Sequence, residues 1–195
     1  MPANGWLVRT SLVRFGVPAA LMALLTVAPT TVGAGAAHAD TNYGGGCVLY
    51  SNNPLATVDS IRHHCTDAQQ DQIYNGARPG NVPSGLTDGW VARPPFIQAI
   101  APAFWVGKTF YTGPKGGTLT NRITPQSIPG WPANVYVGPG RMDGHPAWLI
   151  DYAPSITPQI LDEIREVSPG VWLGYSWWRG FFQTPQLLNF VLVEH

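Results

Sequence analysis

Short segments rich in Val, Ile and aromatic residues follow one another along the second half of the chain. Each is bounded by turn-forming residues, and they recur about every 8 to 15 residues, a pattern typical of antiparallel strands. They cover residues 103–111, 118–124, 133–138, 147–152, 164–167, 171–178 and 186–193. The pattern fits an antiparallel barrel or sandwich, and we favour a barrel because closure removes exposed strand edges.

The segment before these strands has a helical pattern. Asn53 precedes Pro54, a typical helix start, and apolar residues follow at helical spacing, which predicts a helix over residues 54–64. A second helix is expected from Thr66 or Asp67 to Tyr74. Residues 40–46 are expected to be a flexible lead, and the Pro- and Gly-rich stretch 78–102 a loop or a wandering edge segment.

A turn at residues 168–170 (Ser-Pro-Gly) indicates a hairpin between the preceding and following segments. The preceding segment, 158–167, also tolerates a helix. We expect helix from Pro158 to about residue 161 and strand after it.

The N-terminus has the order of a secretory signal. Arg9 and Arg14 precede an apolar run over residues 15–28, which is shorter than the ~20 residues needed to cross a bilayer, and a small-residue stretch ends at Ala39. We expect cleavage before Asp40, with an uncleaved anchor as the alternative. The expected organisation is a signal peptide at 1–39, a helical, disulfide-containing segment at 40–82 and a β-barrel domain at 83–195. A secreted or cell-envelope location follows.

Composition narrows the function classes. The chain has 195 residues, equal numbers of acidic and basic residues, and 41 Gly and Pro, counts that disfavour a helical bundle. There is no Lys/Arg cluster, so nucleic acid is not an expected partner. No apolar run of spanning length lies in the mature chain, for which we expect no membrane span and a monomer.

The two cysteines lie in the predicted mature chain. In an oxidising compartment the pair Cys47 and Cys65 predicts a disulfide. The alternative is a metal site that adds His63 and His64, but adjacent histidine side chains diverge and the spacing matches no zinc-finger pattern. We therefore expect neither a metal nor another cofactor.

Several motifs stand in order along residues 83–193: Trp105-Val106-Gly107-Lys108-Thr109-Phe110, Asn121-Arg122, Asp143 to Tyr152, Asp162 to Gly174, and Phe190-Val191-Leu192. As a set they resemble a family of mostly uncharacterised small proteins with Trp-x-Gly-Lys-x-Phe, Asp-Tyr and Asp-Glu-Ile-Arg-Glu-Val-x-Pro-Gly motifs. The order is also loosely similar to lipocalin-like domains named for a Gly-x-Trp-x-Gly signature. The resemblance implies a compact lipocalin-like barrel and brings no established reaction.

Candidate ligand-binding residues come from strands that neighbour one another in such a barrel. Converging aromatic residues with one cation, one acid and one amide would suit an amphipathic molecule with a small polar head. The candidates are Trp105, Lys108, Phe110, Asn121, Asp151, Tyr152, Arg165 and Trp177. For Arg165 the competing hypothesis is a structural, partly buried ion pair with Glu163, Asp162 or Asp151.

Catalytic patterns are weaker. No Gly-x-Ser-x-Gly occurs, and Ser176 lacks the second glycine of that motif. Asp151, Asp162, Glu163 and Glu166 could supply the two carboxylates of a glycoside hydrolase.

Three functions thus remain open. The favoured one is a secreted barrel that binds a small apolar or lipid-like ligand; the others are a non-enzymatic cell-envelope interaction module and a carboxylate-based hydrolase or isomerase acting in the cavity.

Overall fold

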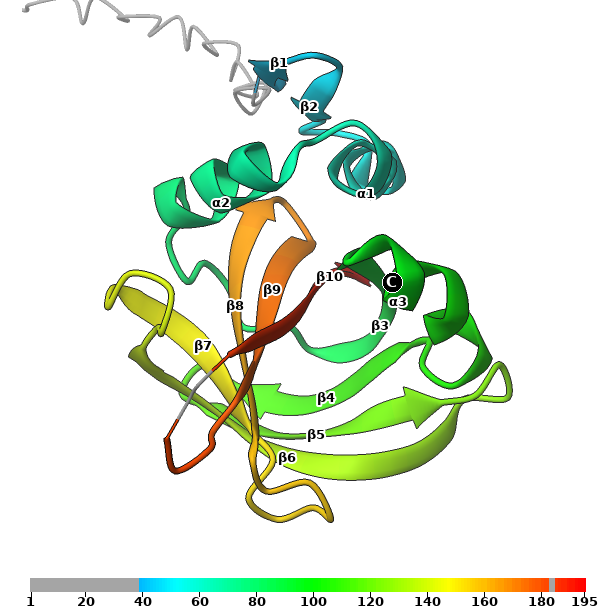
Figure 1. Cartoon of the computed structure of the whole chain (residues 1–195), viewed down its shortest axis with the longest axis vertical. Helices are drawn as coiled ribbons and strands as arrows, with labels where there is room; N and C mark the ends of the chain where they lie inside the picture. The colour runs from blue at the N-terminus through cyan, green and yellow to red at the C-terminus, as the bar shows by residue number, and fades with distance from the viewer. Residues whose placement is uncertain (1–38, 183–184) are drawn as a thin grey trace, which may run out of the picture. The chain divides into compact units, whose positions relative to one another are not determined.

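The protein is an antiparallel β-barrel with a small helical appendage. The computed structural model describes residues 39–182 and 185–195; within them eight strands close in the order β10-β3-β4-β5-β6-β7-β8-β9 (Figure 1). Every neighbouring pair is antiparallel, and β10 pairs with β3 to complete the ring. The expected mainly β, closed architecture is confirmed. The predicted signal peptide lies outside the described residues, except for Ala39.

The barrel strands are β3 (Gly85–Arg93), β4 (Gly107–Gly113), β5 (Gly116–Ile123), β6 (Ile128–Pro139), β7 (Pro146–Asp151), β8 (Ile160–Ser168), β9 (Val171–Trp178) and β10 (Gln186–Glu194). The remaining elements are β1 (Thr41–Gly44), β2 (Cys47–Leu49), α1 (Pro54–His63), α2 (Asp67–Gly76), α3 (Pro95–Ile100) and the 3-10 turn η1 (Ala101–Ala103).

Three local predictions are wrong. Residues 78–102 are not a loop, because β3 and α3 lie within them; Gly89 is needed in β3, where an added Cβ would come 2.5 Å from the Trp105 ring. Residues 158–161 form no helix, since strand pairing begins at Ile160 opposite Trp178. The lead at 40–46 forms most of a β1–β2 hairpin.

Alternation along the strands divides the wall into two faces. Inward side chains from seven strands, β4 to β10, pack as one cluster, which includes Phe110, Leu119, Val135, Trp148, Ile164, Trp172 and Phe190. Its members Phe110, Trp148 and Trp172 fill the half of the barrel near the β4–β5 and β8–β9 turns, whereas Tyr152 and Phe190 line the other half. The segment before β3 covers the end near these turns: the indole N–H groups of Trp148 and Trp172 donate to the carbonyls of Gly80 (3.2 Å) and Asn81 (2.8 Å).

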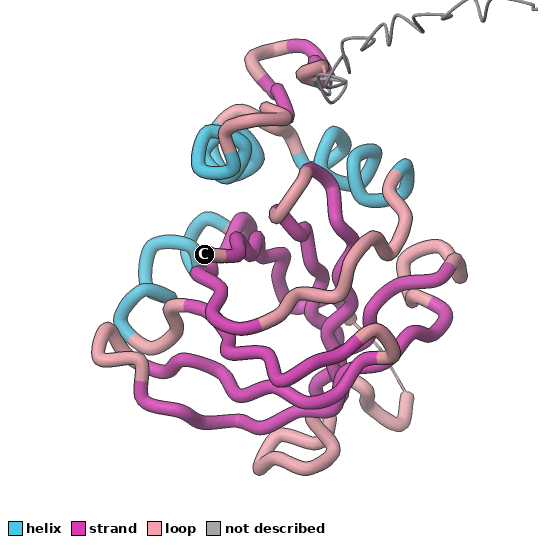
Figure 2. Tube along the Cα trace, turned by 180° about the vertical axis from the view of Figure 1, so that it is seen from behind, coloured by secondary structure: helices cyan, strands magenta, loops and turns pink. Residues whose placement is uncertain are grey.

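The appendage packs on the outer face of β9, β10 and β3. Val58 and Ile61 of α1 and Ile73 and Tyr74 of α2 share a buried cluster with outward residues of those strands such as Leu173. The two helices lie outside the ring of strands (Figure 2). Both begin at the expected residues: the Asn53 side chain caps α1, and Thr66 forms a capping box with Gln69 at α2.

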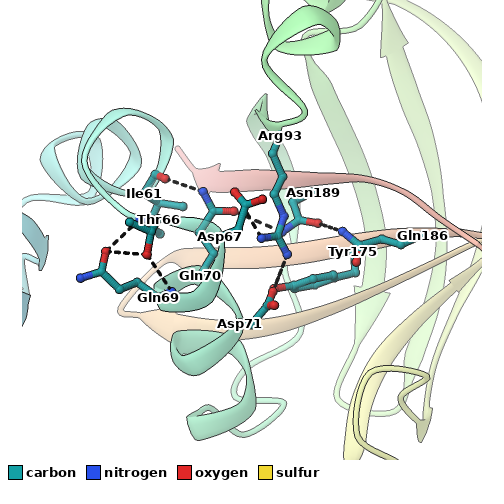
Figure 3. A network of polar contacts seen from close by, with 10 residues as sticks. All are labelled: Ile61, Thr66, Asp67, Gln69, Gln70, Asp71, Arg93, Tyr175, Gln186 and Asn189. Carbon is teal, nitrogen blue, oxygen red and sulfur yellow. Dashed lines mark hydrogen bonds and ion pairs between the residues drawn. The ribbon is translucent and has the colours of Figure 1, made fainter.

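A polar network joins α2 to the barrel wall (Figure 3). Arg93, at the end of β3, pairs with Asp71, whose carboxylate also accepts from the Tyr175 hydroxyl at 2.6 Å. Asn189 of β10 donates to the side chain of Gln70 at 3.2 Å. These contacts fix the orientation of α2 on the wall.

The predicted disulfide between Cys47 and Cys65 is present and connects β2 to the segment between α1 and α2. Cys47 is fully buried in the cluster that the appendage shares with the barrel. The bond therefore pins the N-terminal hairpin to the helical pair. Both sulfur atoms are engaged in it and do not serve as thiolate metal ligands.

Candidate ligand cavity

A cavity of about 250 Å³ occupies the other half of the barrel interior. Its mouth lies at the end where the β3–β4, β5–β6, β7–β8 and β9–β10 connections meet. Apolar side chains form most of the lining, among them Val91, Ile97, Phe104, Trp131, Leu188 and Phe190. Polar side chains gather on one part of the wall: Lys108, Asn121, Tyr152, Asp162, Thr157 and Ser176.

Lys108 is the centre of the polar group. It points inward from β4, and its ammonium is within hydrogen-bonding distance of Asn121 Oδ1 (3.0 Å), the Tyr152 hydroxyl (2.6 Å) and Asp162 Oδ2 (3.1 Å). The Tyr152 hydroxyl also donates to Asp162 Oδ2 at 3.0 Å. Four strands or strand ends thus contribute to one buried network.

Aromatic rings surround the same ammonium. It lies 5.4 Å from the ring centre of Trp105, 5.3 Å from that of Tyr152 and 5.1 Å from that of Phe190. The Trp105 indole donates to Asn121 Oδ1 at 2.9 Å, and the Asn121 amide donates to the carbonyl of Trp131 at 3.0 Å. Cation–π contacts partly replace the hydration that Lys108 loses.

Burial sets the electrostatics of the network. It lowers the pKa of Lys108, an effect that the adjacent Asp162 carboxylate opposes. Burial and the charge of Asp162 together raise the pKa of Tyr152 well above its usual value, so the phenol stays protonated. Lys108 and Asp162 form a buried ion pair, and the polar wall carries no net charge.

Four of the predicted residues, Trp105, Lys108, Asn121 and Tyr152, line the cavity together. Phe110 points inward from β4 as well, but it is buried in the cluster that fills the closed half. The sequence therefore predicted three of the six polar lining residues, Lys108, Asn121 and Tyr152, and the neighbouring Trp105.

The structure places the other three candidates outside the barrel. Asp151 is the residue before Tyr152 and faces outward, where it pairs with Arg179 at 2.6 Å. Trp177 precedes Trp178 on β9 and packs on the cluster beneath the appendage. Both follow from strand alternation, which sends adjacent residues to opposite faces.

Arg165 also faces outward. It is fully buried, where the structural hypothesis expected partial burial, and its partner differs from the expected acids. Both guanidinium nitrogens bond to Asp143, at 2.7 and 2.6 Å, and the guanidinium lies 4.4 Å from the Tyr74 ring centre. Glu163 instead accepts from the backbone N–H of Met142 at 3.1 Å. The actual partner, Asp143, lies in the β6–β7 loop and was not among the predicted acids.

Three polar residues of the cavity, Thr157, Asp162 and Ser176, are not among the ligand-binding residues predicted from the sequence. Asp162 was considered as an acid for catalysis or for Arg165, and Ser176 was considered only as a nucleophile. The available signal was alternation, because Asp162 and Ser176 are directly paired in the register of β8 and β9 and share the inward face. Phe190, whose motif strand was recognised, was missed too.

The four acids considered for hydrolysis do not gather in the cavity. Asp162 lines it, whereas Asp151 and Glu163 face outward. Glu166 lies at the closed end, where it accepts from the backbone N–H groups of Asn81 and Gly170. These residues therefore do not assemble the two facing carboxylates that glycoside cleavage uses.

Exposed apolar side chains lie on connections at the same end of the barrel as the mouth. Phe181 and Phe182 in the β9–β10 connection are fully exposed, and Ile156, Phe96 and Ile100 are largely exposed on the neighbouring connections. The four connections at this end contain a single charged residue, Arg179. These four connections, which we call the rim, are thus apolar as well.

No protein-family model matches the chain, and no curated protein matches it either. Among solved structures, a crystal structure of a protein from Thermomonospora curvata is similar at 18% sequence identity and a TM-score of 0.47. The similarity covers 72% of this chain and 95% of that one. In the part of the chain that the structure describes, no helix is both long and apolar enough to cross a bilayer.

Proposed function

We propose that the protein binds a small, mainly apolar molecule inside its barrel. The supporting observation is the cavity of about 250 Å³ with apolar walls and one polar group at its side. Ligand sites in proteins have this composition: an apolar lining with a few placed polar groups that fix orientation. Eight-stranded barrels are also the size that holds one small ligand.

The volume limits the size of the ligand. An apolar cavity of about 150 Å³ accepts benzene, and sites for drug-sized molecules begin near about 300 Å³. A molecule with one or two rings, or a short branched chain, fits between these limits. Longer fatty acyl chains would have to extend past the mouth.

Export remains part of this proposal. The disulfide supports it, since such bonds persist in oxidising compartments outside the cytoplasm. A protein in that location would meet small apolar molecules outside the cell or in the envelope.

Isothermal titration calorimetry with naphthalene and 2-naphthol tests the binding proposal. We expect saturable binding with one site per chain. Val91→Phe, which places a larger side chain in the cavity, should weaken binding about tenfold or more, since the added atoms occupy the ligand's space. Leu86→Phe is the matched control on the same strand, because Leu86 is half exposed and does not line the cavity. Absence of saturable binding by both probes, or equal loss in both variants, would contradict the proposal.

The exposed rim favours a second candidate, a cell-envelope interaction module. Fully exposed Phe181 and Phe182 and the near absence of charge suit contact with an apolar surface. Such contact needs the rim and not the interior. Val91→Phe should therefore leave this function intact while it impairs ligand binding.

A further inference from the structure

Some polar groups of the cavity wall have all their hydrogen-bond partners within the protein, and others have none. This difference predicts which chemical groups of a ligand the wall can bind. A protonated lysine has three N–H groups to donate, and those of Lys108 are matched by three acceptors: Asn121 Oδ1, the Tyr152 hydroxyl and Asp162 Oδ2. The ammonium therefore has no donor left for a ligand. A carboxylate could bind it only by breaking one of these bonds.

Asn121 and Tyr152 are occupied too. The Asn121 amide donates to the Trp131 carbonyl and to the Tyr152 hydroxyl, while its oxygen accepts from Lys108 and Trp105. The single O–H of Tyr152 is directed to Asp162 Oδ2 at 3.0 Å. Neither side chain offers a free donor to a bound molecule.

Two other polar atoms on the same wall are unused. Among the described residues, the hydrogen bonds of Asp162 are made by Oδ2, and neither Asp162 Oδ1 nor the Ser176 hydroxyl makes one. Both side chains are more than nine-tenths buried, and both line the cavity. Residues 162 and 176 are direct partners in the β8–β9 register, so their inward side chains are neighbours.

We infer that the cavity selects a neutral ligand with a hydroxyl or N–H group, which donates to Asp162 Oδ1 beside the Ser176 hydroxyl. This inference rests on the proposed function and specifies the ligand class of the same site. A carboxylate oxygen that has no donor from the protein and faces a mainly apolar cavity favours a ligand that supplies one. Where the ligand group is a hydroxyl, the Ser176 hydroxyl donates to its oxygen.

The charges of the wall disfavour ligands that carry a carboxylate. Lys108 and Asp162 already neutralise each other, so a carboxylate ligand would bring an unpaired negative charge next to Asp162. Burying such a charge is costly. Fatty acids and aromatic acids are therefore disfavoured, and alcohols, phenols and neutral N–H heterocycles are favoured.

The test compares three probes on the same two fused rings: naphthalene, 2-naphthol and 2-naphthoate. In calorimetric titrations of the full chain at pH 7 we expect 2-naphthol to bind about 10-fold more tightly than naphthalene, the effect of a hydrogen bond to a charged acceptor. 2-Naphthoate should bind about 10-fold more weakly than naphthalene or not at all. Tightest binding of 2-naphthoate, or equal binding of naphthalene and 2-naphthol, overturns the inference and leaves the proposed function standing. Failure of all three probes to bind overturns both.

Single substitutions test whether Ser176 contributes to the preference for 2-naphthol over naphthalene. Ser176→Ala breaks no hydrogen bond within the described protein, so it should leave the melting temperature unchanged and weaken 2-naphthol about 3-fold or more relative to naphthalene. Thr157→Val is the control, because the Thr157 hydroxyl lines the same cavity but is bonded to Ser155 at 2.9 Å. It should not change the preference, and an equal effect in both variants would overturn the role of Ser176.

Asp162 cannot be replaced alone without leaving the Lys108 charge buried and unpaired. The double variant Lys108→Met, Asp162→Leu removes both charges, a replacement that folded proteins often accept. We expect it to bind naphthalene and to lose the preference for 2-naphthol. A retained preference would show that Asp162 is not the acceptor and would overturn the inference.

Discussion

Two aspartates on the barrel surface hold arginines in similar pairs at different depths. Asp143 binds Arg165 and Asp151 binds Arg179, each through two hydrogen bonds, and each aspartate also accepts from the backbone N–H two residues ahead. The aspartate side chains are equally exposed at 16%, but Arg165 is 0% exposed and Arg179 is 26% exposed. The burial of the arginine should therefore determine how much each pair contributes to the free energy of unfolding.

We expect Asp143→Asn to lower the free energy of unfolding by about 3 kcal/mol, since it leaves the buried Arg165 charge without its counter-ion. Asp151→Asn is the matched control and should cost about 1 kcal/mol or less, because Arg179 stays in contact with water. Both asparagines keep the local turn. Urea unfolding of the two variants measures the difference, and equal losses would contradict the importance of burial.

Acid gives an independent measure of the same pair. Hydrogen bonds from Arg165 hold the pKa of Asp143 at about 2, below its usual value. A lowered folded-state pKa stabilises the protein above the unfolded-state pKa, and this contribution is lost as pH falls from about 4 through 2. The acid-dependent loss should be smaller in Asp143→Asn than in the wild type.

At the residue scale, the alternation of side chains along a strand could predict which residues face inward and which outward. It could not predict the ion-pair partners that come from loops. Lys108, Asn121 and Tyr152 meet in the cavity wall because neighbouring strands of a barrel converge there, and their role in ligand binding stays a prediction. Asp143 was not recognised as the partner of Arg165, since it lies 22 residues away in a loop whose path no local pattern specifies.

At the scale of elements, the disulfide belongs to the appendage and not to the barrel. It closes a separation of 18 residues, for which the chain-entropy relation gives about 3 kcal/mol. We expect the double variant Cys47→Ala, Cys65→Ala to lose about 2 to 4 kcal/mol in urea unfolding while its far-UV circular dichroism keeps the β signal. The reduced wild-type protein serves as the control. Loss of the β signal would show that the barrel depends on the appendage for folding.

Seven of the barrel strands were recognisable because β-branched and aromatic residues mark them. β3 was hidden by the surrounding prolines and by Gly85 and Gly89, which normally indicate loops. Gly89 has a packing reason that appears only in three dimensions, the approach of the Trp105 ring. The start of β8 was hidden as well, because residues 158–161 tolerate a helix and only pairing with β9 determines their conformation.

At the scale of the whole molecule, closure could be predicted from aromatic strands, whereas the open space inside could not. Phe110, Trp148 and Trp172 fill one half of the interior, and smaller side chains such as Val91 and Ser176 leave the other half open. Whether a half of the interior is filled or open depends on the summed side-chain volumes of eight strands. It therefore cannot be predicted from any single segment of the sequence.

The appendage covers only part of the barrel wall, and this asymmetry should govern how the barrel deforms. Strands β9 and β10 lie between the interior and the helices, whereas β4–β6 present exposed outward residues such as Tyr111 and Tyr136. Amide hydrogens of β4–β6 should therefore exchange with deuterium about 10-fold faster or more than those of β9 and β10, as local opening is easier where one layer alone protects the strand. Mass spectrometry of proteolytic fragments measures both rates, and uniform exchange would contradict the expectation. If the proposed function holds, β4–β6 are then the strands that deform to admit a ligand larger than the cavity.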